Sequence, residues 1–187
     1  MFALRDKIIL VTGASRGLGR ALAVEYARQG ASVVINSRRT SAEGLAETER
    51  TLRALNAPVL SVLADVSQRA DVERLAGDAL ARFGRVDVLV NNASALGPTP
   101  MPFLVDTPIE EFDGVMRTNL NGPFMLTRAL IGQMLARGAG SIINVSSDAG
   151  AVGYPTWGAY GVSKAALDHL TRVMKPGAEL RFDLIGT

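Results

Sequence analysis

The chain contains no cysteine among its 187 residues, and it has a single histidine, His169. The lack of cysteine excludes disulfides, thiolate metal sites and cysteine nucleophiles. One histidine also excludes a histidine-based metal cluster, so we expect no metal site. We expect His169 itself on a helix surface or at an interface, without a catalytic role.

Long hydrophobic runs are missing as well. No apolar stretch reaches the roughly 18 residues that a membrane-spanning helix needs. The first residues, MFALRDKIILVTG, have too short an apolar segment and no small-residue cleavage site for a secretory signal. We therefore expect a cytoplasmic protein with no membrane partner.

The chain also lacks clusters of like charge. The formal net charge is only +2, although the pI is about 9.3. That pI reflects arginine, since the 20 basic residues are 17 arginines and 3 lysines. They are spread along the chain without a block of five or more, which favours a solvated surface over a nucleic-acid-binding patch.

What the chain does have is an alternation of short apolar runs with longer amphipathic stretches. Continuous apolar strands separated by helices indicate a parallel sheet covered on both faces. We expect one α/β domain over residues 1–187, a Rossmann-like doubly wound sheet of five or six strands, shortened at its C-terminal edge. The predicted strands are 7–13, 31–37, 57–67, 86–94 and 140–147, and the predicted helices are 16–30, 41–55, 71–83, 109–137 (with a break near NLNGP) and 159–174.

Glycines gather where the first strand meets the first helix, in TGASRGLGR. With Gly13, Gly17 and Gly19 in this turn, the backbone can approach a ligand closely. The following helix offers unpaired N–H groups at the positive end of its dipole. A pyrophosphate fits such a turn, and a purely structural turn is the alternative. The position after the first strand of an α/β chain favours dinucleotide binding.

The second strand ends in Ser37, Arg38 and Arg39, with no carboxylate. In a doubly wound sheet this strand end lies beside the adenosine ribose of a dinucleotide on the glycine turn. A carboxylate there selects NAD by binding the ribose hydroxyls, whereas a guanidinium matches a 2′-phosphate. Ser37, Arg38 and Arg16 therefore predict NADP, with Arg39 facing solvent. A pair of solvated arginines that opens a helix is the alternative.

The segment YGVSK places Tyr160 and Lys164 four residues apart, and thus on one face of a helix. A nearby ammonium stabilises a phenolate, which makes a tyrosine usable as an acid or base near neutral pH. An ordinary amphipathic helix with an exposed lysine is the alternative.

The spacing TGxxxGxG on such a chain resembles the short-chain dehydrogenase/reductase family. Further matches are ADV at 64–66, NNA at 91–93 and YGVSK at 160–164, and the resemblance runs from Lys7 to about Met174. It implies hydride transfer between a nicotinamide cofactor and a carbonyl or alcohol substrate. The implied cofactor contacts are Gly13, Ser15, Arg16, Gly17, Leu18, Gly19, Ser37, Arg38, Asp65, Val66, Asn91, Ala93, Tyr160 and Lys164.

The resemblance also implies four catalytic roles. Ser147 would hydrogen-bond the substrate oxygen, with Ser146 as its competitor for that role. Tyr160 would donate or accept the proton. Lys164 would hold the nicotinamide ribose and stabilise the phenolate. Asn119 would sit at the helix break and hold a water that links Lys164 to solvent, or would act only as a local cap.

The sequence departs from the family after the helix of Tyr160 and Lys164. Family members continue with a sixth strand, a mobile substrate-binding loop and a seventh strand, whereas an atypical tail, residues 175–187, follows here. Alternation in LRFDLIG favours a sixth strand, and an unrelated, partly disordered tail is the alternative. Without the loop we expect a site open to water, with the cofactor held mainly at its adenosine and phosphate end.

Two functions follow from this sequence. The leading one is an NADP(H)-dependent oxidoreductase that interconverts a ketone or aldehyde and an alcohol. The resemblance implies a homodimer or homotetramer, since the family's equivalents of helices 121–137 and 159–174 pack against a second subunit. The alternative is a truncated, catalytically weak dinucleotide-binding protein that acts through subunit association. The residues that select a substrate lie in 94–108, 148–158 and the C-terminal region.

Overall fold

A computed structural model describes residues 4–174 and 180–186 of the chain. Its strands form one parallel sheet in the order β3-β2-β1-β4-β5-β6. The order reverses direction between β1 and β4, which is the switch point where doubly wound sheets bind ligands. The predicted fold class is therefore confirmed. The strands are β1 (Ile8–Val11), β2 (Ser32–Ser37), β3 (Val59–Leu63), β4 (Val88–Asn91), β5 (Ser141–Ser146) and β6 (Arg181–Gly186).

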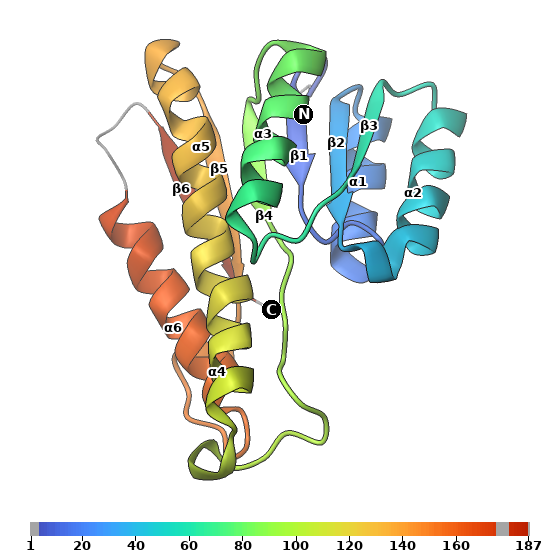
Figure 1. Cartoon of the computed structure of the whole chain (residues 1–187). Helices are drawn as coiled ribbons and strands as arrows, with labels where there is room; N and C mark the ends of the chain where they lie inside the picture. The colour runs from blue at the N-terminus through green and yellow to red at the C-terminus, as the bar shows by residue number, and fades with distance from the viewer. Residues whose placement is uncertain (1–3, 175–179, 187) are drawn as a thin grey trace.

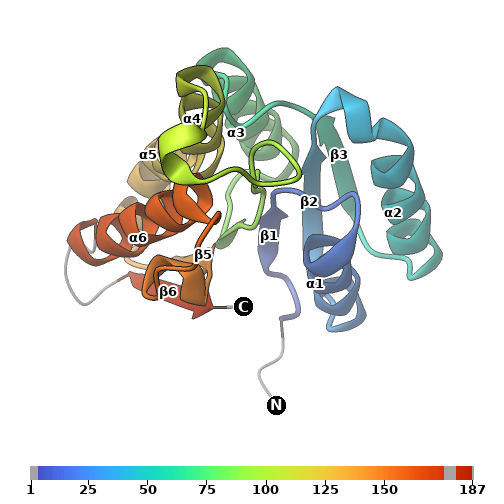
Figure 2. The same cartoon turned by 90° about the horizontal axis from the view of Figure 1, so that it is seen from below.

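Helices cover both faces of this sheet. On one face lie the helices that follow β3, β4 and β5, and on the other lie those that follow β1 and β2 (Figures 1 and 2). No described helix is both long and apolar enough to span a membrane. In chain order the helices are α1 (Gly17–Arg28), α2 (Ala42–Ala54), α3 (Arg69–Phe83), α4 (Ile109–Met116), α5 (Gly122–Ala136) and α6 (Gly158–Val173).

The core has two halves, one on each side of the sheet. Alternate strand residues point to opposite faces, so Leu10 and Leu89 pack towards α3 and α5, while Ile9 and Ile35 pack towards α1 and α2. Each of these side chains is at most 1% exposed. Burial of one such side chain stabilises the fold by about 1.5–3 kcal/mol. The central strands are thus a rigid base for the loops at their carboxyl ends.

The predicted break in the helical region 109–137 is a π-helical turn, Arg117–Asn121, between α4 and α5. Pro123 falls in the first turn of α5, where its missing N–H breaks no helical bond. The chain therefore stays helical through NLNGP. The wider turn carries Asn119 inward, where it is 1% exposed.

Strand β6 confirms the sixth strand that LRFDLIG predicts. It pairs in parallel with β5 from Ser141 and Arg181 to Ser146 and Gly186, and the preceding Leu180 is buried in the core. Most side chains of β6 are nevertheless exposed. Residues 175–179 and 187 of the predicted tail lie outside the described residues.

Candidate active site

The glycine turn lies at the switch point of the sheet because Thr12 joins the ends of β1 and β4. Its hydroxyl oxygen accepts hydrogen bonds from the backbone N–H groups of Asn92 and Ala93, both at 3.0 Å. The same hydroxyl donates to the carbonyl of Val90 at 3.3 Å. The side-chain amide of Asn92 returns a bond to the carbonyl of Thr12 at 2.8 Å. These bonds fix the loop after β4 against the loop after β1.

Two glycines allow this close approach. A Cβ on Gly13 would lie 2.9 Å from the Cα of Ala93, and Gly13 also has a positive φ of 67°. A Cβ on Gly19 would lie 2.4 Å from the carbonyl oxygen of Gly13. A larger residue at either position would thus push the turn apart. Gly17 differs, because its φ is 55° but a Cβ there would meet no atom within 4 Å, so the turn is open on that side.

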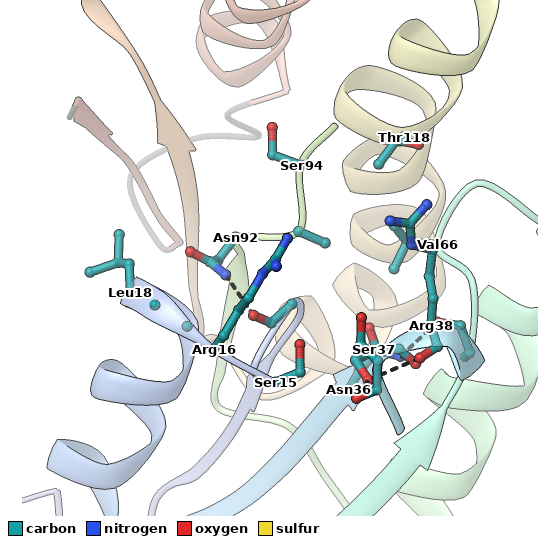
Figure 3. A pocket seen from close by; sticks show the side chains of 16 residues that line it. Ser15, Arg16, Leu18, Asn36, Ser37, Arg38, Val66, Asn92, Ser94 and Thr118 are labelled. Carbon is teal, nitrogen blue, oxygen red and sulfur yellow. Dashed lines mark hydrogen bonds between the residues drawn. The ribbon is translucent and has the colours of Figure 1, made fainter. Parts of the chain in front are cut away.

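A cleft of about 270 Å³ lies beside the turn (Figure 3). Arg16 borders it from the turn and Arg38 from the end of β2. No carboxylate is among its lining residues. Neither guanidinium forms an ion pair within the described residues. The cleft therefore presents two guanidinium groups, and no carboxylate among its own lining residues, beside an open glycine turn.

Most of the predicted cofactor contacts border this cleft or the one beside it. A second cleft, of about 550 Å³, shares Arg16 and Arg38 with the first and is also bordered by the carboxylates of Asp65 and Glu111. Of the predicted contacts, the first cleft is lined by Gly13, Ser15, Arg16, Gly17, Leu18, Gly19, Ser37, Arg38, Val66 and Ala93.

The side chain of Asn91 is buried in the core, and its cofactor contact stays a prediction. Its side-chain amide donates to the side-chain oxygen of Asn144 at 2.8 Å, and Asn144 donates in turn to the hydroxyl of Thr171 at 2.8 Å. This buried chain of bonds joins β4 and β5 to α6. Its neighbour Asn92 borders the first cleft.

Tyr160 and Lys164 lie one turn apart on α6, near the end of β5. The Nζ atom of Lys164 lies 5.4 Å from the centre of the Tyr160 ring. The same ammonium donates to the carbonyl oxygen of Val145 at 2.6 Å. Burial lowers the pKa of Lys164 to about 8, while the negative charge of Asp168 raises it in part.

The two serines at the end of β5 have different environments. Ser146 is 4% exposed and its hydroxyl donates to the carboxylate of Asp168. Ser147 is more accessible: its hydroxyl oxygen accepts from the N–H of Ala149 at 3.3 Å, and the hydroxyl donates to Asp148 at 3.2 Å. The geometry thus favours Ser147 over Ser146 as the serine that a ligand can reach.

Asn119 is held by the backbone of the loop after β4. Its oxygen accepts from the N–H of Ala95 at 2.7 Å, and its amide donates to the carbonyl of Ala95 at 2.8 Å. The amide also donates to the hydroxyl of Ser163 at 2.9 Å, one residue before Lys164. Asn119 therefore ties the π-helical turn to α6. Its predicted water link to Lys164 stays a prediction.

Sequence reasoning missed three residues that hold the site together: Thr12, Ser163 and Asp168. Thr12 and Ser163 stand inside the motifs TGxxxGxG and YGVSK, so their positions carried a signal. Asp168 lies one turn after Lys164 on the same helix face, a spacing that also predicts an interaction. In the described residues, no group of three or more His, Cys, Asp or Glu side chains could hold a metal. His169 is exposed on α6.

These residues fit a dinucleotide. Arg16 precedes α1 in an extended conformation and gives it no side-chain cap, so the first N–H groups of the helix face the cleft without that partner. Free N–H groups at a helix N-terminus bind phosphate. Gly17 leaves room for the ligand, and two arginines add positive charge.

Comparisons with known proteins agree with this geometry. The sequence profile of the short chain dehydrogenase family matches residues 7–180. An uncharacterized oxidoreductase of Thermotoga maritima is 40% identical over 90% of this chain and 64% of its own length. The 2-(R)-hydroxypropyl-CoM dehydrogenase of Xanthobacter autotrophicus is 41% identical over 89% of this chain and 66% of its own.

Solved structures are similar over nearly the whole chain. A short-chain dehydrogenase/reductase from Burkholderia phymatum, in complex with NAD, has a TM-score of 0.92 and 34% identity, covering 100% of this chain and 66% of that one. A metagenomic short-chain oxidoreductase in complex with NADP has the same TM-score and identity, covering 99% and 83%. This chain thus spans about two thirds of most of these relatives. It belongs to the short-chain dehydrogenase family.

Proposed function

We propose that the protein is an NADP(H)-dependent oxidoreductase that interconverts a ketone or aldehyde and an alcohol. One observation carries the cofactor preference: the cleft beside the glycine turn is lined by Arg16 and Arg38 and by no carboxylate. Known structures of similar proteins bind NAD in one case and NADP in another, so the preference rests on these side chains.

The proposed cofactor contacts divide between the two ends of the site. The N–H groups of the turn at Gly17 and Gly19 would bind the pyrophosphate. Arg16 and Arg38 would bind the 2′-phosphate, since a guanidinium matches phosphate in charge and shape. The nicotinamide ribose would lie against Lys164. When bound, the cofactor would supply or accept the hydride.

Residues at the end of β5 and on α6 would carry out the proton transfer. Ser147 would hold the substrate oxygen through its hydroxyl. Tyr160 would donate a proton to that oxygen in reduction and accept it in oxidation. The ammonium of Lys164, 5.4 Å from the Tyr160 ring centre, would stabilise the phenolate. Asn119 would hold the π-helical turn against α6, which carries Tyr160 and Lys164.

The proposed assembly is a homodimer or homotetramer built on α5 and α6. Apolar side chains support it: Phe124 on α5 is 40% exposed and Val173 on α6 is 63% exposed. Light scattering after size-exclusion chromatography gives the mass directly. A monomer at assay concentration would rule this assembly out.

The test of the function is turnover. Purified protein is mixed with NADPH and a panel of ketones and aldehydes, and cofactor oxidation is followed by absorbance. Turnover of a carbonyl with NADPH favoured over NADH supports the proposal. Cofactor binding without turnover of any substrate contradicts the enzyme and favours a dinucleotide-binding protein that acts through subunit association.

A further inference from the structure

Three aromatic rings stand in a row between β5 and the start of α6. The rings of Tyr154 and Trp157 have centres 6.5 Å apart at 65°. The rings of Trp157 and Tyr160 have centres 5.7 Å apart at 73°. These edge-to-face contacts are favourable. They lead from an exposed loop directly to the tyrosine of the proposed reaction.

The carboxylate of Asp148 lies at the Tyr154 end of this row, just after β5. Asp148 accepts a hydrogen bond from the hydroxyl of Tyr154 at 2.8 Å and another from that of Ser147 at 3.2 Å. The Tyr154 bond, and to a lesser degree the Ser147 bond, holds the pKa of Asp148 below its usual range. Asp148 has no ion-pair partner in the described part of the chain.

These groups border an open surface depression of about 440 Å³, lined by the exposed residues Asp148, Tyr154, Pro155 and Trp157. Backbone hydrogen bonds from Asp148 and Ala149 also reach this carboxylate, so what Asp148 offers a ligand is its negative charge. Aromatic faces attract a cation through their negative quadrupole, also at solvent-exposed sites. An anion would meet the carboxylate and no positive side chain among these lining residues.

We propose that this depression, the aromatic subsite, binds a cationic group of the substrate. It rests on the proposed function. The substrate is then a ketone or alcohol that carries an ammonium or alkylated ammonium group. The row of contacts from Ser147 through Asp148, Tyr154 and Trp157 to Tyr160 joins this subsite to the residues of the proposed proton transfer. Asp148 and Trp157 thereby become the specificity-determining residues.

The probe pair is choline and 3,3-dimethyl-1-butanol, which have nearly the same shape and differ in charge. Trp157 is the only tryptophan of the chain, so its fluorescence reports on the subsite alone. Ligand-observed NMR gives a second readout that is independent of quenching. Both are measured on the protein without cofactor. We expect choline to bind at least about tenfold more tightly than the alcohol, a difference of about 1.4 kcal/mol.

Two variants and a matched control separate charge from shape. Asp148→Asn keeps an acceptor for the Tyr154 hydroxyl but removes the charge, so it should weaken choline binding by about tenfold or more and leave the alcohol unchanged. Trp157→Ala, followed by NMR, should weaken choline binding as well. Asp78→Asn, an exposed substitution on α3, should change neither. Equal binding of the two probes, or unchanged choline binding in Asp148→Asn, would overturn the proposal.

Turnover distinguishes this proposal from the function on which it rests. If neutral ketones are reduced as fast as amino ketones, the aromatic subsite does not select the substrate. The proposed oxidoreductase activity would still stand. Selective choline binding with no turnover of any carbonyl would support the subsite and defeat the oxidoreductase.

Discussion

The ammonium of Lys164 donates a 2.6 Å hydrogen bond to the carbonyl oxygen of Val145. This bond ties α6, which carries Tyr160, to the end of β5, which carries Ser147. It holds a cation in a site that is 3% exposed. The arrangement has an energetic cost, because burial disfavours the charged form of lysine.

Lys164→Met removes both this cost and the hydrogen bond to Val145, so its effect on stability should depend on pH. The folded pKa is about 8 and the ordinary value 10.5, so between these values the unfolded chain binds more protons than the folded one. The free energy of unfolding of the wild type therefore rises with pH between these two pKa values. Below the lower pKa, the wild type is at its least stable relative to the variant. The stability of Lys164→Met relative to the wild type should be greater near neutral pH than at about pH 10 by up to about 3 kcal/mol, while the lost bond to Val145 lowers it equally at every pH. Urea unfolding at several pH values measures it. A difference that does not vary with pH would contradict the assignment.

Asp168→Asn should lower the pKa of Lys164 further below about 8. The carboxylate of Asp168 raises that pKa by its charge, whereas asparagine keeps an oxygen acceptor for Ser146 and removes the charge. The chain has only three lysines, so NMR of ¹³C-labelled lysine side chains can follow each titration. The signal that is absent in Lys164→Met identifies Lys164. An unchanged or higher pKa would show that Asp168 does not act through charge.

Gly19→Ala should destabilise the protein and weaken cofactor binding. Its Cβ would lie 2.4 Å from the carbonyl oxygen of Gly13, whereas a Cβ on Gly77 in α3 meets nothing within 4 Å. We expect a loss of about 2 kcal/mol for Gly19→Ala. The control Gly77→Ala should gain up to about 1 kcal/mol through helix propensity. Chemical denaturation compares the two, and equal stabilities would refute the close approach in the turn.

The cofactor preference should reverse when the end of β2 is changed. Ser37→Asp combined with Arg38→Leu adds a carboxylate for the ribose hydroxyls and removes a phosphate partner. The ratio of NADP to NAD affinity should fall by roughly ten- to a hundredfold, the worth of a charge-assisted bond. Calorimetric titration with both dinucleotides measures the ratio. Arg39→Leu, at the neighbouring exposed position, is the control and should leave it unchanged. An unchanged ratio in the double variant would remove Arg38 from the site.

The fold and the order of motifs were predictable from the sequence because both depend on periodicity and on glycine. Buried parallel strands read as apolar runs, and the close approach at Gly19 requires glycine. The sixth strand was predictable from the alternation of Leu180, Phe182 and Leu184. Each of these patterns lies within a short segment of the sequence, so it can be recognised without knowledge of contacts between distant segments.

Other features depend on contacts between distant segments. The NLNGP segment predicted a helix break, yet Pro123 needs no N–H at the start of α5 and the chain forms a π-helical turn. The side chain of Asn91 joins Asn144, 53 residues away, and no local pattern reports that pairing. The row from Tyr154 to Tyr160 depends on the path of an irregular loop, which periodicity does not describe.

Tyr160 is the proposed proton donor in NADPH-dependent reduction of a carbonyl. The most direct measurement compares the wild type with Tyr160→Phe, using the best carbonyl substrate of the panel at saturating NADPH. Phenylalanine keeps the ring against Trp157 and removes only the hydroxyl. We expect NADPH still to bind and kcat to fall by about 10²- to 10⁴-fold. Retained turnover in Tyr160→Phe would contradict it.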